Sequence, residues 1–275
     1  MSHPSSVSEN ERWKREREFF DRQSQAANLH PVPPETLHRY GALRRRYFSP
    51  EYRYRVVGDL KGKRVLEVGC GEGENSAVLA KLGAHVTGID ISQGAIDTAL
   101  ERCRVNGVAD RVEFVCSPIE LADFPAGSFD VVWGEAILHH LLGDLDMVLS
   151  HLTRWAKPDG IILFAEPVAL SSALKTLRRM IPVHTEATPD ERPLEAGELE
   201  LVARYLRGGE FRFFEFLGRL DHFVVPERNF EKSSAPRRAI STVLHLIDYG
   251  LLSLPVTNKL GGVCVMHGRP APARA

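Results

Sequence analysis

The chain has 275 residues, of which 43% are hydrophobic and 26% are charged, and this suits one elaborated domain with a substantial core. Thirty-five basic and 36 acidic residues give a formal net charge of -1, so bulk charge points to neither nucleic acid nor an anionic membrane. Four cysteines without a CxxC pair argue against a disulfide framework and a structural zinc site.

The N-terminal residues are polar and charged, and they lack the apolar run of a signal peptide. No apolar stretch approaches the length that is needed to cross a bilayer. We therefore expect a cytoplasmic protein with no membrane span, present as a monomer or a homodimer.

Three helical segments are expected before residue 60. Residues 9–27 have helical spacing, a second helical stretch runs through Tyr40, and residues 53–60 have the pattern of a short helix. We expect residues 1–59 to form a helical lid or an acceptor-binding segment.

From residue 64 onward, short apolar strands alternate with helices. The expected strands are 64–70, 85–91, 111–117, 128–136 and 160–168, and the expected helices are 74–83, 92–107 and 143–160. This alternation implies βαβ crossovers, and therefore a parallel sheet with helices on both faces. Ligands of such sheets bind beyond the carboxyl ends of the strands.

After residue 168 this alternation stops. The later expected elements are helical segments within 170–207, an aromatic β-like stretch at 210–225, a helix at 236–252 and a strand at 261–269. We expect residues 60–275 to form one domain that carries an insertion at about 170–260.

The stretch VLEVGCGEGENSA (residues 65–77) combines a glycine-rich loop with three glutamates. A dinucleotide fingerprint, G-x-G-x-x-G, needs a glycine at position 74, where this chain has a glutamate. Glu67, Glu72 and Glu74 would also repel a pyrophosphate. Both conflicts disappear for S-adenosyl-L-methionine, which has no phosphate and carries a sulfonium and an ammonium group.

Four motifs, in order, resemble the class I S-adenosylmethionine-dependent methyltransferases, in particular the bacterial small-molecule group that includes ubiquinone-type enzymes. They are VLEVGCGEG (65–73), VTGIDIS (86–92), SFDVVWGEAILHHL (128–141) and LTRWAKPDGIILFAEP (152–167). The resemblance covers about residues 60–168. It implies an α/β fold: a Rossmann-like, seven-stranded, mostly parallel sheet with an N-terminal helical lid and helical insertions after strands 5 and 6.

The resemblance also implies S-adenosyl-L-methionine as cofactor and places its binding residues at strand ends. Asp90 would bind both ribose hydroxyls, and Glu67 occupies the acidic position of the first motif. The other expected cofactor-binding residues are Gly69, Cys70, Gly71, Gly73, Ile91, Ser117, Pro118, Gly134 and Tyr54. Pro118 stands where the family usually has an acid that contacts adenine, so Ser117, Glu120 or backbone groups would take that role.

Methyl transfer requires an aligned acceptor, exclusion of water and, for some acceptors, a base. The candidates for catalysis follow the fourth strand, and they are Glu135, His139 and His140. Adjacent helical residues point about 100° apart, so one histidine at most is expected to reach the acceptor, and either could be structural instead. Glu166, after the fifth strand, either faces the acceptor or forms a structural salt bridge. No metal-ligand spacing is present, so we expect no required metal.

The expected function is O-methylation of a hydroxyl or carboxyl group of a small-molecule acceptor, such as a specialised metabolite or a quinone-like compound. The alternatives are C- or N-methylation of a small molecule, including a prenyl diphosphate, and a non-catalytic cofactor-binding or scaffold protein. The near-neutral charge argues against nucleic acid as the substrate.

Overall fold

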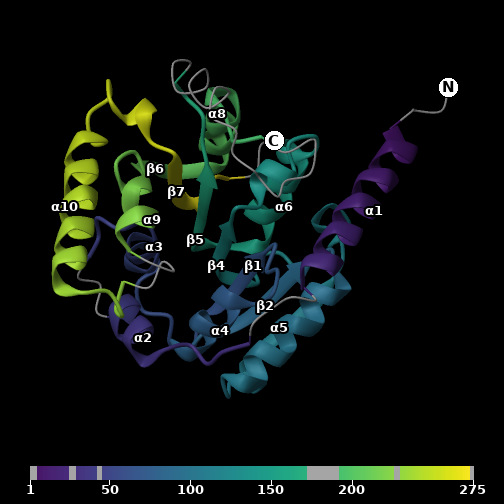
Figure 1. Cartoon of the computed structure of the whole chain (residues 1–275). Helices are drawn as coiled ribbons and strands as arrows, with labels where there is room; N and C mark the ends of the chain where they lie inside the picture. The colour runs from purple at the N-terminus through teal and green to yellow at the C-terminus, as the bar shows by residue number, and fades with distance from the viewer. Residues whose placement is uncertain (1–4, 25–28, 42–44, 172–191, 226–229, 273–275) are drawn as a thin grey trace.

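The computed structural model describes residues 5–24, 29–41, 45–171, 192–225 and 230–272, with side chains from residue 11 onward. The chain folds into one seven-stranded sheet with helices packed on it (Figure 1). The strands are β1 (Arg64–Val68), β2 (His85–Asp90), β3 (Val112–Cys116), β4 (Phe129–Glu135), β5 (Ala156–Pro167), β6 (Leu206–Phe214) and β7 (Val263–Pro270). The principal helices are α1 (Ser5–Ser24), α2 (Pro34–Gly41), α3 (Ser49–Val57), α4 (Glu74–Lys81), α5 (Gln93–Val105), α6 (Leu145–Trp155), α8 (Ala196–Tyr205), α9 (Asp221–Val224) and α10 (Ala235–Leu251).

The strand order is β3-β2-β1-β4-β5-β7-β6. Strands β1 to β5 pair in parallel, and β7 runs antiparallel between β5 and β6. This is the mostly parallel, Rossmann-like sheet that the sequence predicts. The order of connection reverses at β1, which lies between β2 and β4, and this switch point is where such sheets bind ligands.

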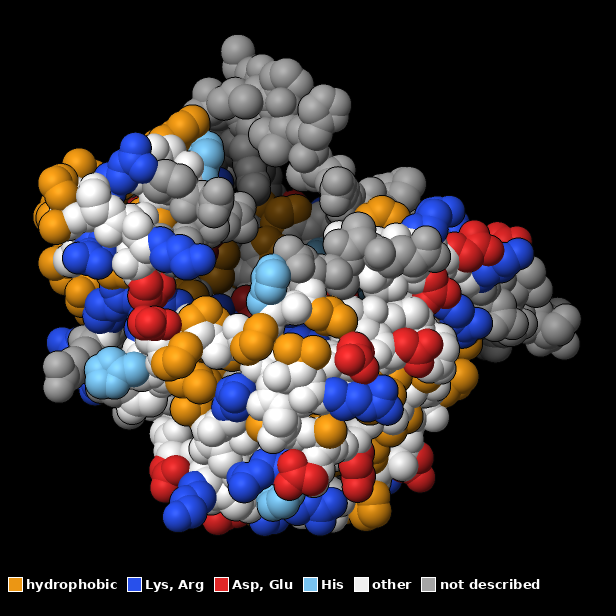
Figure 2. All heavy atoms as spheres, turned by 60° about the horizontal axis from the view of Figure 1, so that its bottom comes forward, with side chains coloured by type: hydrophobic (Ala, Val, Ile, Leu, Met, Phe, Trp, Pro, Cys, Tyr) orange, Lys and Arg blue, Asp and Glu red, His pale blue; other side chains and the backbone are white. Residues whose placement is uncertain are grey.

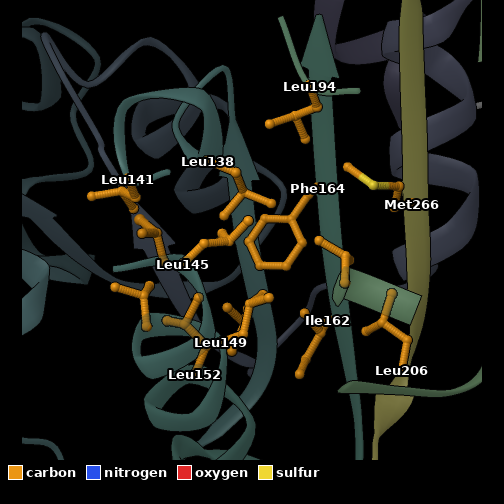
Figure 3. Close-up of a cluster of buried hydrophobic side chains, with 14 of the residues drawn as sticks. Leu138, Leu141, Leu145, Leu149, Leu152, Ile162, Phe164, Leu194, Leu206 and Met266 are labelled. Atoms are coloured by element: carbon orange, nitrogen blue, oxygen red, sulfur yellow. The ribbon is translucent and has the colours of Figure 1, made fainter. Parts of the chain in front are cut away.

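Alternate residues of the central strands enter two separate hydrophobic clusters, one on each face of the sheet. Leu66, Val68 and Phe164 belong to a cluster that α6 and α8 cover, whereas Val65 and Trp133 belong to one that α3 and α4 cover. Figure 3 shows the first cluster, in which the ring of Phe164 is surrounded by leucines of α6 and of the turn after β4. The period of two in a strand that is buried on both faces explains the continuous apolar runs of the sequence.

One helix is shorter than the sequence predicts. The helix expected at 143–160 ends at Trp155, and residues 156–159 instead begin β5. Ala156 is already extended, with φ -70° and ψ 144°, and Pro158 restricts the residue before it to extended conformations. Ala156 pairs with Phe129, and the register then shifts before Val131 pairs with Ile161.

The aromatic stretch expected as β-like at 210–225 is displaced. Strand β6 begins at Leu206 and ends at Phe214, and Glu215 follows with a φ of 64°, which takes the chain out of the extended conformation. The second half of the stretch contains the short helix α9. The aromatic composition therefore predicted a strand correctly but placed it several residues too late.

The chain between β5 and β7 contains α8, β6, α9 and α10, and the part of the expected helical insertion at 172–191 lies outside the described residues. Before β1, α3 packs into the core, where Tyr54 and Val57 share a cluster with Trp133. The division at residue 59 stays a prediction. Within the described ranges, none of the helices combines the length and the apolar character that crossing a membrane requires.

Candidate cofactor-binding and active site

The glycine loop joins β1 to α4 at the switch point of the sheet. Gly69 and Gly71 have φ values of 65° and 47°, in the left-handed region that favours glycine. A Cβ added at Gly69 would lie 2.5 Å from the side chain of Ile137, whereas one at Gly71 would meet nothing within 4 Å. Gly69 therefore permits close packing against the turn after β4, and Gly71 presents bare backbone to the space beyond the strands.

That space is a cavity of about 140 Å³ at the carboxyl ends of β1, β2, β3 and β4. Six residues that the sequence singles out for cofactor binding line it, namely Gly69, Gly71, Asp90, Ile91, Ser117 and Pro118. His140 and Glu120 line it as well. Residues that lie far apart in the sequence thus meet here because parallel strands end at the same edge of a sheet.

The carboxylate of Asp90 is held rigidly at the cavity wall. Its Oδ2 accepts a hydrogen bond from the amide of Gly71 at 2.8 Å, and its Oδ1 accepts one from the amide of Ser92 at 2.9 Å. Burial raises the pKa of Asp90, and these amide hydrogen bonds oppose that rise. Each carboxylate oxygen keeps a lone pair for a hydroxyl donor in the cavity.

The N-terminal helix α1 forms the outer wall of the cavity, through Glu16 and Phe20. Near its end, Asp21 Oδ1 accepts hydrogen bonds from Ser92 Oγ at 2.5 Å and from the amide of Gly94 at 3.0 Å. These contacts attach α1 to the N-terminus of α5, beside the strand end that carries Asp90.

A second attachment holds the middle of α1. Arg12 forms ion pairs with Glu120 and, at 3.2 Å, with Asp144. Trp13 Nε1 also donates to Glu120 Oε1 at 3.4 Å. Glu120, which the sequence offers as an adenine contact, therefore lines the cavity and anchors its outer wall.

The turn after β4 is built around the buried carboxylate of Glu166. Glu166 is 0% exposed, and its Oε1 accepts hydrogen bonds from the amides of Ile137 at 2.8 Å and Leu138 at 2.9 Å. Its Oε2 lies 2.9 Å from His139 Nδ1. Just before this turn, Ala136 adopts a φ of 52°, an uncommon conformation that such contacts maintain.

The two histidines have different surroundings. The ring of His139 is held by Glu166, whereas His140 lines the cavity and its ring packs edge-on against Phe20, with centroids 5.7 Å apart. The two histidine rings lie 4.2 Å apart. The sequence left open which histidine is positioned for chemistry, and the geometry gives each a distinct environment.

Glu135 forms an ion pair with Arg53 of α3 and accepts a hydrogen bond from Asn75 Nδ2 at 2.9 Å. Burial acts to raise the pKa of Glu135, but the guanidinium of Arg53 and the Asn75 amide hold it below its usual value. An ionised, paired carboxylate is a weak proton acceptor. The arrangement favours electrostatic binding over general-base catalysis for Glu135.

The acids of the glycine loop lie away from the cavity lining. Glu67 is 2% exposed and accepts a hydrogen bond from Ser76 Oγ, and burial raises its pKa to about 8. Glu72 pairs with Arg102 at 3.2 Å, and the Glu74 side chain is 80% exposed. The acidic residues that do line the cavity are Glu16, Asp90 and Glu120.

The remaining predicted cofactor residues are not among those that line this cavity. They are Cys70, Gly73, Gly134 and Tyr54. Tyr54 stacks on Tyr40 with centroids 4.4 Å apart, and its buried hydroxyl has no hydrogen-bond partner among the described residues. Cys70 is 5% exposed, and burial raises the pKa of its thiol well above the usual value.

Sequence reasoning missed Glu16 and Ile137 as lining residues. The helical spacing of α1 predicts a helix but gives no signal that this helix packs over strand ends about 70 residues away. No group of three or more His, Cys, Asp or Glu side chains in the described part of the chain is arranged to hold a metal ion. Independence from metal stays a prediction.

Comparison with known proteins places this fold and site in a family. Residues 66–164 match the model of the family described as "Methyltransferase domain". The ubiquinone biosynthesis O-methyltransferase of Methylococcus capsulatus is 35% identical over 158 residues, which are 54% of this chain and 62% of that protein. The corresponding protein of Bordetella avium is 29% identical over 208 residues, or 66% of this chain and 85% of that one.

Among solved structures, the geranyl diphosphate C-methyltransferase of Streptomyces coelicolor matches with a TM-score of 0.57 over 94% of this chain and 98% of that one, at 12% identity. That likeness concerns the fold alone. The family match, the relatives and the fold agree. Residues 66–164 match a methyltransferase domain, and the chain is similar to methyltransferases of class I, the S-adenosylmethionine-dependent class. The chain spans less than two thirds of the length of its Methylococcus relative.

Proposed function

We propose that this chain transfers a methyl group from S-adenosyl-L-methionine to a hydroxyl or carboxyl group of a small, quinone-like acceptor. The observation that carries the proposal is the cavity in which the Asp90 carboxylate, the bare backbone of Gly71 and the turn of His139 and His140 come together. The relatives named as ubiquinone biosynthesis O-methyltransferases support both the oxygen as methyl acceptor and the quinone-like class.

The cavity suits the cofactor in three respects. The Asp90 carboxylate offers two acceptor oxygens for the two ribose hydroxyls. Gly71 allows close approach of the ligand to the backbone. No lysine or arginine is among the described residues that line the cavity, and a ligand without phosphate does not need one.

Arg53 and Glu135 are suited to the amino-acid part of the cofactor. They form a partly buried ion pair at the carboxyl end of β4, and Arg53 Nε has no hydrogen-bond partner among the described residues. A carboxylate is the natural partner for such a guanidinium, and Glu135, 37% exposed at its side chain, presents negative charge for an ammonium. When bound, the cofactor supplies a methyl group that is already activated on a sulfonium.

We propose that His139 is the base that removes the proton of the acceptor hydroxyl. Glu166 accepts a hydrogen bond from Nδ1 of His139. This contact fixes the ring and leaves Nε2 of His139 as the basic nitrogen. Glu166 acts through His139 and is therefore a positioning residue. His140, in the cavity wall against Phe20, would contact the cofactor and help to exclude water.

The direct test is methyl transfer from radiolabelled S-adenosyl-L-methionine to a panel of phenols, catechols and aromatic carboxylic acids. Label in an O-methyl product supports the proposal. Label on carbon or nitrogen would replace it with one of the alternative acceptor chemistries. Cofactor binding without turnover on any acceptor, including amines and prenyl diphosphates, would favour a non-catalytic protein.

A further inference from the structure

The outward face of α10 is apolar. Its exposed side chains include Ile240, Val243, Leu246 and Ile247, with exposed fractions of 51%, 53%, 47% and 49%. Residues three, four and seven positions apart lie on one face of a helix, so these four form a continuous stripe, called here the α10 stripe. Figure 2 shows hydrophobic side chains gathered along the left edge of the molecule, the side on which Figure 1 places α10.

The inward face of the same helix is polar, which reverses the usual pattern of a surface helix. The buried residues of α10 are Ser241, His245 and Asp248. Asp248 accepts hydrogen bonds from the three successive amides of residues 216–218, and Asp221 bonds both Ser241 and His245. Hydrogen bonds thus hold the inner face of the helix against the protein. The apolar residues on its outer face take no part in this packing.

The charge along the segment that carries the α10 stripe is positive. Between residues 232 and 259, the cationic residues are Lys232, Arg237, Arg238 and Lys259, and the one acid, Asp248, is 1% exposed. Arg237 before the stripe and Lys259 after it are exposed. Leu254 and Val256, 56% and 85% exposed, follow the helix directly and add apolar surface.

A second copy of the chain is a poor partner for this surface. In a twofold pairing of α10 with itself, a parallel arrangement would bring Arg237 against its counterpart. An antiparallel arrangement would bring it toward the end that carries Lys259. Because residues 232–259 expose no acid, neither arrangement pairs these cations.

We propose that α10 is an interfacial helix that docks this face of the protein onto a bilayer surface rich in anionic lipid. An apolar stripe with cations beside it is the arrangement by which helices lie in the plane of an interface rather than cross it. The formal net charge of -1 does not oppose this, because the attraction depends on local charge within a Debye length of the membrane. The proposal does not depend on methyl transfer.

Flotation of the full chain with lipid vesicles tests the proposal. Vesicles of phosphatidylcholine alone are compared with vesicles that contain about one third phosphatidylglycerol, at low and high salt. The variant V243S/I247S removes half of the stripe, and V105S/M147S is its control, with side chains 40% and 42% exposed on α5 and α6. Thermal melting confirms that both variants fold.

We expect the wild type and the control to float with the anionic vesicles, and V243S/I247S to bind at least about tenfold more weakly. Binding should weaken with salt and should be much lower on phosphatidylcholine alone. Absence of flotation, equal binding to both vesicle types, or equal binding of the folded V243S/I247S variant would overturn the proposal. A solution dimer that V243S/I247S dissociates would overturn it in favour of a second copy.

Discussion

The Nδ1 atom of His139 lies 2.9 Å from Oε2 of Glu166, whose other oxygen accepts two backbone amide hydrogen bonds of the same turn. One buried carboxylate thus shapes the turn after β4 and orients the imidazole that follows it. Because the ring is held through Nδ1, the proposed proton transfer falls to its other nitrogen, Nε2.

Replacement of His139 by glutamine should lower kcat by about 10²-fold or more, because the side chain can no longer take a proton. His140→Gln is the matched comparison, and it should act mainly on cofactor affinity. A His139→Gln enzyme with wild-type kcat would refute the assignment of the base.

The Glu166→Gln variant should separate the effect of Glu166 on the orientation of the His139 ring from its effect on the folding of the turn. The amide oxygen of glutamine can still accept from Ile137 and Leu138, but its NH₂ group cannot accept from His139 Nδ1. We expect kcat to fall by about tenfold or more, with a changed pH–rate profile and little change in KM for the cofactor. A variant that loses only thermal stability would show that Glu166 has a structural role alone.

Glu67 should make the stability of the protein depend on pH. Burial raises its pKa from 4.5 to about 8, so between these values the folded chain holds a proton that the unfolded chain has released. The stabilising contribution of that proton is complete below the lower value and is lost as the pH rises through the upper one.

The Glu67→Gln variant should therefore be more stable than the wild type above pH 8, by about 5 kcal/mol in free energy of unfolding, and the two should converge in acid. Denaturant unfolding across the pH range measures this difference. Glu74→Gln, at an 80% exposed side chain, is the control and should follow the wild type. Parallel pH curves for wild type and Glu67→Gln would contradict the burial of a carboxyl group with a raised pKa at this position.

The attachment of α1 should matter for cofactor retention. Asp21→Ala removes the acceptor of the Ser92 and Gly94 hydrogen bonds, and we expect the cofactor to dissociate about tenfold faster because the outer wall of the cavity loosens. Lys14→Ala is the control on the same helix, since the Lys14 side chain is 76% exposed. Stopped-flow displacement measures the rate, and equal rates for both variants would argue that α1 is not a lid.

Activity is expected to survive removal of divalent metal. No metal-binding group of His, Cys, Asp and Glu side chains is formed by the residues that the structure describes, and His139 offers a base that needs no metal. Assays after dialysis against EDTA should retain wild-type kcat. A loss of activity that Mg²⁺ restores would assign the activation of the acceptor to a metal instead.

The sequence predicts the sheet and the strand-end residues well because both depend on local patterns. Alternating strands and helices imply a parallel sheet, and such a sheet brings Gly69 and Asp90 to one edge whatever the rest of the chain does. The position of α1 was not predictable in this way, since it depends on single contacts such as Asp21 with Ser92. The burial of Glu67 was not predictable either, because it depends on tertiary packing and on the contact with Ser76; its part in cofactor binding stays a prediction.

The error in the predicted end of α6 has a similar cause. The helix-ending residues Pro158 and Gly160 come several positions after Trp155, and the pairing of Ala156 with Phe129 in the neighbouring strand is a tertiary interaction that no local pattern contains. Likewise, the sequence predicts the helix α10 but not its reversed polarity. Which face is buried depends on tertiary contacts, namely those of Asp221 and of the backbone amides that donate to Asp248.

The central claim is that Asp90 binds the cofactor in the cavity at the switch point of the sheet. Isothermal titration with S-adenosyl-L-methionine tests it most directly, with Asp90→Asn compared against Asp97→Asn, a variant at an exposed residue of the following helix. We predict that Asp90→Asn raises Kd at least about tenfold, through loss of charge-assisted hydrogen bonds, while Asp97→Asn leaves it unchanged. A folded Asp90→Asn protein with wild-type affinity would contradict the account.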